Sequence, residues 1–163
     1  MQLQNPLWAF ALKVYSHSEI EQCCLALQND FGMNINRLLF AAWLATQHKS
    51  IDVALLRHSQ ADYWQKSMTH PLRALRYQLR ELRRDESELS MLYDAMRNAE
   101  LEAEKVELAY LYQLAENWPQ VVMTSEVLIV ENIEKLASAK SVCIKTTQRE
   151  LLASFGQQIL LVG

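Results

Sequence analysis

The sequence is poor in the two residues that most often interrupt regular secondary structure, with only three glycines and three prolines in 163 residues. Together they make up 6 of the 163 residues, whereas about 12% is usual. This scarcity excludes collagen-like chains, flexible glycine-rich linkers and most turn-rich all-β designs. Half of the residues are hydrophobic, so a mainly helical globular chain remains, long enough to bury one core without disulfides or metal.

Cysteine is also scarce, with three residues in the chain: Cys23, Cys24 and Cys143. An odd number cannot pair completely within one chain, and adjacent residues point about 100° apart on a helix. We therefore expect reduced thiols in a cytoplasmic protein, with Cys23 and Cys24 packing within a helix rather than reacting.

An excess of charge of one sign is absent, and so is any long hydrophobic run. The formal net charge is −3, which leaves no overall basic field to attract nucleic acid. No run of about 18 apolar residues occurs, so no membrane-spanning helix is predicted. No lysine or arginine precedes the first apolar run, so no signal peptide is predicted either.

Capping residues and apolar spacing instead predict helices along the whole chain. The first begins at Asn5, the second ends near Gly32, and Asn34 caps a third. Residues 38–45 are apolar on almost every side of that third helix, which places it at the centre of a core. We predict an all-α single domain over residues 1–163, a bundle of about six or seven helices around this central apolar helix.

Two prolines indicate helix boundaries in the middle of the chain. Pro71 fits the first turn of a helix behind Thr69, which predicts a helix over about residues 70–83. Residues 87–118 contain neither glycine nor proline. The longest helix is therefore expected there, ending before Pro119.

The C-terminal part, about residues 120–163, is predicted to hold further helices. A capping pattern at Thr147 starts the last of them, which is expected to end at Gly156. Two β-rich segments, 141–145 and 158–162, are each too short to form a sheet alone. A minor pairing of these two segments as β-strands is the one exception that we allow to an all-helical chain.

Five arginines share one broad face of the helix expected at residues 70–83: Arg73, Arg76, Arg80, Arg83 and Arg84. All except Arg83 are candidate residues for binding a protein partner or an anion, because guanidinium groups bind carboxylates and phosphates. The next helix carries glutamates at the matching spacing, at positions 100, 104 and 107. Ion pairing between the two helices is therefore favoured over partner binding, with plain solvation as the third interpretation.

The same glutamates raise the question of a metal site. Di-metal carboxylate bundles use a Glu-x-x-His pair, and this sequence contains none. His48 with Asp52 and His58 with Asp62 could each orient an imidazole, but surface hydrogen bonding or capping is favoured. Signatures of ATPases, zinc proteins and serine hydrolases are also missing, so no catalytic residue, metal or cofactor is predicted.

Tryptophan and tyrosine are numerous enough to line a cavity for an apolar ligand. The candidate lining residues combine aromatic walls with polar groups: Gln28, Asn36, Trp43, His58 and Trp64. Packing of the aromatic residues in the core is the favoured alternative. A ligand site would be an enclosed cavity of about 300 Å³ or more beside Trp43 or Trp64.

Several segments resemble one known family: NPLWAFAL at residues 5–12, LALQNDFG at 25–32 and NRLLFAAWLA at 36–45. Trp64, PLRALR from residue 71 and ELEAE from residue 100 extend the resemblance over roughly residues 5–115. The family consists of small uncharacterised proteobacterial proteins known only as a domain of unknown function, so the resemblance implies no activity, cofactor or catalytic residue. Its members tend to have Asp-Val-Asn where this chain has Asn34-Ile35-Asn36, which removes a carboxylate from that loop.

Two classes of function stay open. The first, favoured because no catalytic pattern stands out, is a cytoplasmic, non-enzymatic adaptor that binds another protein, with self-association left open. The second is a small-ligand-binding protein or enzyme that uses an aromatic cavity. An exposed apolar patch of several hundred Å² rimmed by arginine would favour the adaptor.

Overall fold

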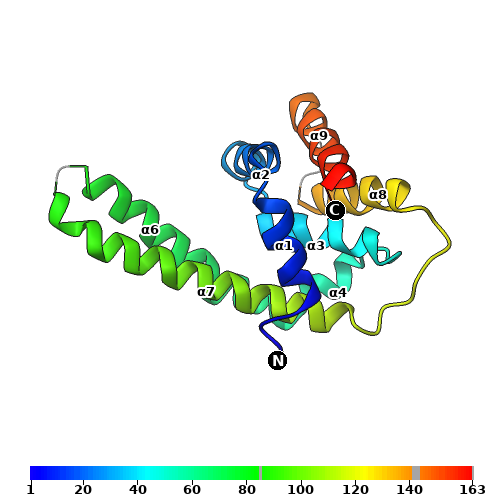
Figure 1. Ribbon diagram of the computed structural model, residues 1–163, viewed down its shortest axis with the longest axis horizontal. Helices are drawn as coiled ribbons and strands as arrows, with labels where there is room; N and C mark the ends of the chain where they lie inside the picture. Colours follow the sequence, from blue (N-terminus) through cyan, green and yellow to red (C-terminus); the bar gives the residue numbers. More distant parts are fainter. Residues whose placement is uncertain (85, 141–143, 163) are drawn as a thin grey trace.

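The computed structural model describes residues 1–84, 86–140 and 144–162 (Figure 1). All regular secondary structure in this part of the chain is helical, so the predicted all-α fold class is confirmed. Helices are more numerous than expected because residues 53–69 divide into short pieces. The elements are α1 (Pro6–Tyr15), α2 (Ser18–Phe31), α3 (Ile35–Thr46), α4 (Val53–Arg57), α5 (Gln60–Trp64), the π-helix η1 (Gln65–Thr69), α6 (His70–Leu82), the 3₁₀-helix η2 (Ser87–Leu89), α7 (Ser90–Ala115), α8 (Ser125–Lys140) and α9 (Thr146–Val162).

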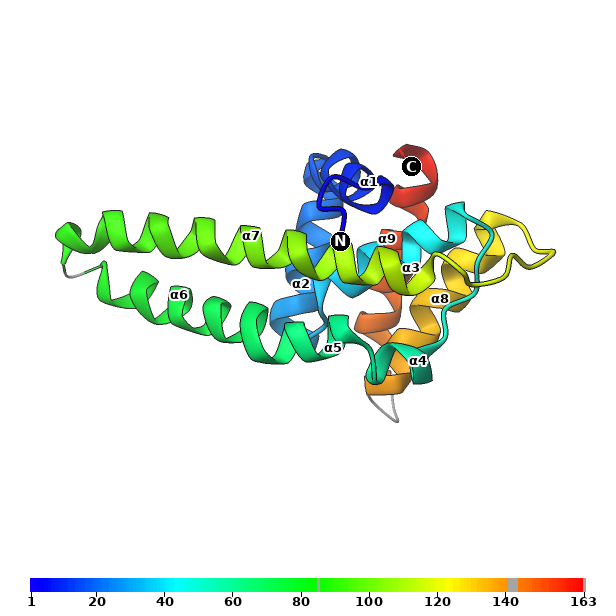
Figure 2. The ribbon, with the colours of Figure 1, turned by 90° about the horizontal axis from the view of Figure 1, so that it is seen from below.

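The molecule consists of a helical body and a long projecting hairpin (Figures 1 and 2). The hairpin is formed by α6 and α7, which run antiparallel and side by side in both views. No residue of α6 is buried, whereas the second half of α7 packs into the body against α1 and α3. None of the helices in the described residues is both long and apolar enough to cross a membrane.

The body is built around α3, as the apolar run at residues 38–45 predicts. Every residue of that run is buried, and α3 contacts α1, α2, α7 and α8. Asn34 caps the helix, because its side chain accepts a hydrogen bond from the Arg37 backbone N at 2.9 Å. The fully buried Phe40 packs on Trp43 and Trp118, with ring centroids 6.3 and 5.9 Å apart. The predicted central apolar helix is therefore confirmed.

A buried asparagine fastens α8 to this core. Asn132 is fully buried, and its Oδ1 accepts a hydrogen bond from the backbone N of Ile51 at 2.8 Å. Its Nδ2 donates to the carbonyl oxygens of Lys49, at 3.0 Å, and Ala41, at 3.2 Å. One side chain thus satisfies three backbone groups where the chain leaves α3, and polar groups buried there would otherwise destabilise the fold.

A π-helical turn joins α5 to α6. The helix predicted over about residues 70–83 is confirmed as α6, with Pro71 in its first turn, but the chain is already helical before it and Thr69 does not start it afresh. Thr69 has helical backbone angles and its side chain caps nothing. Pro71 lacks an N–H, and in a regular helix its ring would clash with the carbonyl four residues earlier. In the wider turn the His70 N–H donates to the Gln65 carbonyl, which relieves this conflict without ending the helix.

The end of the chain also differs from expectation. The last helix, α9, continues past Gly156 to Val162. Both the predicted helix end at Gly156 and the predicted strand at residues 158–162 are therefore wrong. The other predicted strand, at residues 141–145, lies partly outside the described residues, which do not include 141–143. Phe155 and Ile159 on either side of the glycine are buried in the core. Their burial outweighs the cost of about 1 kcal/mol that glycine brings to a helix interior.

Replacing Gly156 with alanine should raise the free energy of unfolding by about 0.5–1 kcal/mol. A Cβ at this position would meet Ile129 Cγ2 and Ile133 Cδ1 at 3.8 Å, which is ordinary van der Waals contact. The contrasting variant is Gly32→Ala, which should lose about 1 kcal/mol because Gly32 ends α2 with a φ of 60°. Urea unfolding of the three proteins measures both effects, and a loss of stability in Gly156→Ala would contradict this packing.

Candidate functional site

The inner face of α7 carries three glutamates that meet α6 and α3. Arg73 of α6 donates from Nε to Glu100 Oε1 at 2.8 Å and also pairs with Glu104. Arg76 pairs with the same Glu100 carboxylate, and its Nη2 lies 3.3 Å from Oε1. The ion pairing predicted between these two helices is therefore present, although Arg80 and Arg84 take no part in it.

The carboxylate at the centre of this network is held in its charged form. Burial alone would raise the pKa of Glu100, but hydrogen bonds from Arg76 and Arg73 outweigh it and lower the pKa. The bonds to Glu100 in turn raise the pKa of Arg76. One buried anion thus binds two guanidinium groups and fixes the hairpin where it leaves the body.

Two further glutamates on the same face lie in a less polar environment. Burial raises the pKa of Glu104, although the pairing with Arg73 opposes the shift. Glu107 is 1% exposed, and burial raises its pKa to about 7, which the nearby Thr69 and Asn36 side chains oppose only in part. A carboxyl group that can gain or lose a proton near neutral pH therefore lies inside the body.

The surroundings of Glu107 are only partly satisfied by hydrogen bonds. Asn34 Nδ2 donates to Glu107 Oε1 at 3.3 Å. The other carboxyl oxygen, Asn36 Nδ2 and Thr69 Oγ1 complete no hydrogen bond with any described residue. All three groups are buried, and Thr69 belongs to the π-helical turn, so that turn brings a hydroxyl to the carboxyl group.

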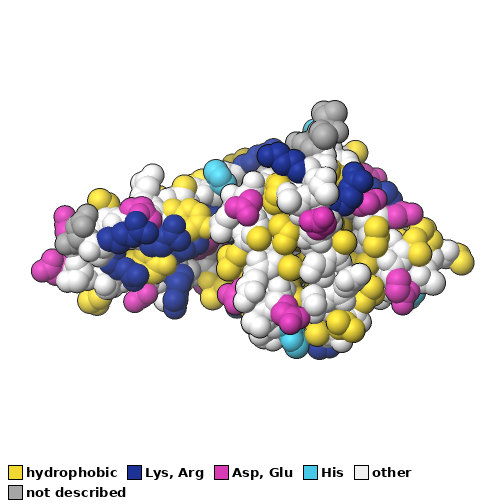
Figure 3. Space-filling view, turned by 90° about the horizontal axis from the view of Figure 1, so that it is seen from above, with side chains coloured by type: hydrophobic (Ala, Val, Ile, Leu, Met, Phe, Trp, Pro, Cys, Tyr) yellow, Lys and Arg dark blue, Asp and Glu magenta, His cyan; other side chains and the backbone are white. Residues whose placement is uncertain are grey.

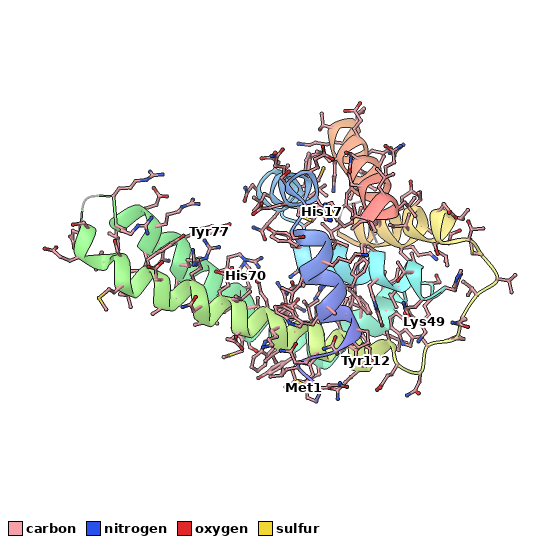
Figure 4. The ribbon with its side chains drawn as sticks, in the orientation of Figure 1. Met1, His17, Lys49, His70, Tyr77 and Tyr112 are labelled. Atoms are coloured by element: carbon pink, nitrogen blue, oxygen red, sulfur yellow. The ribbon has the colours of Figure 1, made fainter. Side chains whose placement is uncertain are left out.

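A cleft of about 590 Å³ opens between α2 and the hairpin, and we call it the arginine cleft. Gln28 Nε2 donates to Tyr77 Oη at 3.3 Å and so joins α2 to α6 beside it. Figure 4 shows Tyr77 on the side of α6 that faces α2. The Cζ atoms of Arg76 and Arg80 lie 4.7 and 4.8 Å from the Tyr77 ring centroid. The cleft is lined by apolar residues and by charged side chains, which are Arg73, Arg76, Arg80, Arg97 and the glutamates at positions 21, 100 and 104.

The arginines of this cleft differ in how far they are neutralised. Arg73 and Arg76 are bound to buried glutamates. Arg80 reaches only the exposed Glu81, at 3.4 Å, and Arg97 forms no ion pair with any described residue. Figure 3 shows basic side chains gathered on this side of the hairpin. Two guanidinium groups in the cleft are therefore available to an anionic ligand.

A second cleft of about 340 Å³ lies between α1, α3 and α7, and we call it the apolar cleft. Its walls are mainly hydrophobic and include Trp8, Leu12, Leu39, Leu101 and Leu108. It adjoins the arginine cleft, because both are lined by Tyr15, Ile35, Leu101 and Glu104.

A larger cleft, of about 750 Å³, lies elsewhere in the body. The two cationic side chains that line it already donate hydrogen bonds within the protein. Arg57 donates to the Ala139 carbonyl, and Lys135 donates to Ser50 Oγ at 2.8 Å. We therefore base the candidate site on the two adjoining clefts rather than on this larger one.

The structure does not bring the five predicted cavity residues together. Gln28 lines the arginine cleft, Asn36 the apolar cleft, and the exposed His58 a third cleft of about 490 Å³. Trp43 is a core residue that packs on Tyr112, with ring centroids 5.6 Å apart. Trp64 donates from Nε1 to the Ala103 carbonyl at 2.9 Å. Both tryptophans thus anchor helices and line none of these three clefts.

The remaining sequence candidates also have structural partners. Arg84 Nη1 pairs with Glu81 at 2.5 Å on the surface and lies outside the clefts. Asp62 binds Arg37 of α3 and Lys66 of η1; burial opposes ionisation, but these hydrogen bonds outweigh it and lower the pKa of Asp62. Asp62 therefore serves to hold α5 to α3.

His48, from the other predicted His–Asp pair, and the cysteines also have structural roles. His48 Nδ1 lies 3.0 Å from the Met123 carbonyl, a contact to the loop before α8. Cys24 is fully buried, and burial, with Cys23 as a smaller cause, raises the pKa of its thiol to about 12. This thiol packs in the core as expected and is poorly suited to act as a nucleophile. Cys143 lies outside the described residues.

Several site residues were missed by reasoning from the sequence. Arg97 stands alone in α7, so no spacing pattern marked it, and Leu12 looked like an ordinary residue of an amphipathic helix. Trp8 and Tyr15, in contrast, belong to the tryptophans and tyrosines that the sequence offered as the lining of a cavity. Tyr15 lies in both clefts, and burial raises the pKa of its phenol. Only the packing of α1 across α7 brings these residues to one site, and no local signal reports that packing.

Comparison with known proteins identifies the family. Searches among curated proteins and among solved structures gave no match. A family model described as "Protein of unknown function (DUF2390)" matches residues 6–111, well over half of the chain. This range contains all residues of the two adjoining clefts and the glutamates of α7. The resemblance inferred from the sequence is confirmed, and the chain belongs to the DUF2390 family of proteins of unknown function.

Proposed function

We propose that this protein is a binding module that recognises an acidic segment of another protein through the arginine cleft. The observation that carries the proposal is the unequal pairing of the cleft arginines. Glu100 anchors Arg73 and Arg76 in place, whereas Arg80 and Arg97 project into the cleft with little or no neutralisation. Fixed and available guanidinium groups in one cleft suit carboxylates, which they bind with two parallel hydrogen bonds.

The shape of the molecule supports a role in protein binding. The hairpin projects from the body (Figures 1 and 2), and α6 buries none of its residues. Large apolar side chains are exposed along it, at Leu75, Leu82, Met91 and Leu92. Exposed apolar residues beside arginine are common in interaction surfaces, where buried arginines contribute strongly to binding.

Reversing the charge of the available arginines should abolish recognition. Peptides are selected from a random phage-displayed library on the wild-type protein, and the best binder is synthesised. We expect it to contain several Asp or Glu residues, and we expect Arg80→Glu/Arg97→Glu to bind it at least tenfold more weakly by fluorescence anisotropy. The weakening follows from the loss of two charge-assisted contacts and their replacement by like charges.

The matched control is Lys145→Glu/Arg149→Glu, which changes the net charge equally at exposed positions near the start of α9. It should bind within about twofold of wild type, since interactions between exposed charges more than about 10 Å apart are largely screened at 0.1 M salt. Selected peptides without acidic residues, or equal weakening in both double variants, would overturn the proposal.

A further inference from the structure

The arginine cleft and the apolar cleft adjoin each other and differ in chemical character, and we call the two together the groove. Tyr15, Ile35, Leu101 and Glu104 line both clefts, so the two clefts share a border. One end is lined by Arg80 and Arg97, and the other by Trp8, Leu39 and Leu108. A ligand that fills the groove must therefore combine an anionic part with an apolar part.

The apolar end presents hydrophobic side chains that are not covered by the protein itself. Leu12 is 54% exposed and Leu101 is 49% exposed, although both line the cleft. Asn36 also lines it, but this residue is buried and its side chain lies near the Glu107 carboxyl group. The cleft therefore offers mainly apolar contact to a ligand.

Charge and size together indicate the occupant. About 340 Å³ is enough for one or two large apolar side chains at the apolar end, and the unpaired guanidinium groups at the other end complement carboxylates. An amphipathic helix carries both groups on one face, at spacings of three, four and seven residues. We propose that the groove binds an acidic amphipathic helix of a partner protein, which inserts a large apolar side chain beside Trp8 while its carboxylates contact Arg80 and Arg97.

This inference rests on the proposed function, because it specifies what the acidic segment must contain. The two ideas make different demands on the same selected peptides. Recognition through the arginine cleft alone requires acidic residues in any arrangement. Recognition through the whole groove also requires one large apolar residue at helical spacing from them.

The experiment measures binding of the synthetic peptide and of its alanine variant at the largest apolar position. We expect the alanine peptide to bind wild type at least tenfold more weakly. Leu12→Gln/Leu101→Gln should bind the parent peptide as weakly as wild type binds the alanine peptide, because both changes remove the same contact. Both substitutions are neutral and partly exposed, so they leave the charge of the arginine cleft unchanged.

The matched control is Leu55→Gln/Leu160→Gln, which replaces two exposed leucines of α4 and α9 that line neither cleft and lie outside the hairpin. It should bind the parent peptide like wild type. Peptides that contain acidic residues and depend on Arg80 and Arg97, but tolerate the alanine change, would overturn the helix with an apolar anchor and keep the proposed function. Loss of the dependence on Arg80 and Arg97 would overturn both.

A small amphiphile is the competing occupant, and dodecanoate is the probe for it. Titrated below its critical micelle concentration, dodecanoate should displace the peptide only weakly. Displacement with an affinity at least equal to that of the peptide, lost in Leu12→Gln/Leu101→Gln, would show that the groove binds a free alkyl carboxylate and would overturn the assignment to a partner helix.

Discussion

Replacing Glu100 with alanine should lower the free energy of unfolding by about 3 kcal/mol, a large share of the stability of a domain of this size. Glu100 is 5% exposed and accepts hydrogen bonds from both Arg73 and Arg76. Its loss leaves two largely buried guanidinium groups without their main anion, and breaking a buried pair from one side is costly. Urea unfolding followed by circular dichroism measures the change.

The control for this prediction is Glu81→Ala, which removes an exposed carboxylate bound to Arg84 and Arg80. It should change stability by no more than about 0.5–1 kcal/mol, because exposed ion pairs contribute little. A double-mutant cycle between Arg76→Ala and Glu100→Ala should give a coupling of more than about 1 kcal/mol. Additive effects in that cycle would contradict the network.

The second large effect is expected in the dependence of stability on pH. The pKa of Glu107 is raised from 4.5 to about 7 in the folded protein because the carboxyl is buried. Between these values the unfolded chain binds fewer protons than the folded one, so stability falls as the pH rises through this window. The stabilising contribution is fully present below pH 4.5 and is lost above about pH 7, which amounts to about 3 kcal/mol.

Glu107→Gln should remove this slope. An amide stays neutral at every pH and can still accept the hydrogen bond that Asn34 donates to the glutamate. Between pH 5 and 8 wild type should lose about 2–3 kcal/mol relative to the variant in urea unfolding. Parallel curves for the two proteins over this range would mean that Glu107 is already ionised in the folded state at pH 5.

The loss of stability that we expect at acidic pH has a different origin. Asp62 and Glu100 both have lowered pKa values, because the hydrogen bonds from their cationic partners outweigh burial. Their contribution to stability is present above the pKa of the unfolded chain and is lost as the pH falls through the folded value. Comparison of Glu107→Gln with wild type above pH 5 therefore isolates Glu107 from these two carboxylates.

The sequence predicts those parts of the structure whose signal is local. The central helix follows from eight consecutive small or apolar residues at 38–45, and Asn34 caps it as expected. The pairing of Arg73 with Glu100 could be predicted because both stripes repeat at helical spacing. These elements need only the residues within a few turns of each other, or a regular period, to be recognised.

The rest depends on contacts between distant segments. The unbroken helix through Thr69 and Pro71 depends on a π-helical turn, which no spacing rule indicates. The helix around Gly156 persists because Phe155 and Ile159 are buried against other helices. The groove itself arises where α1 crosses α7, so its lining combines residues 100 positions apart in the chain, from Trp8 to Leu108.

The π-helical turn also sets the rotational phase of everything that follows it. A π turn accommodates one residue more than an α turn, and each residue of an α-helix advances the direction of the side chains by about 100°. Because the helix is continuous from Gln60 to Leu82, this offset is transmitted along all of α6. Without it, Arg73, Arg76 and Arg80 would leave the helix about 100° away from their present direction. A single extra residue in one turn thus decides whether the arginines point at Glu100 and the groove or along another face of the hairpin.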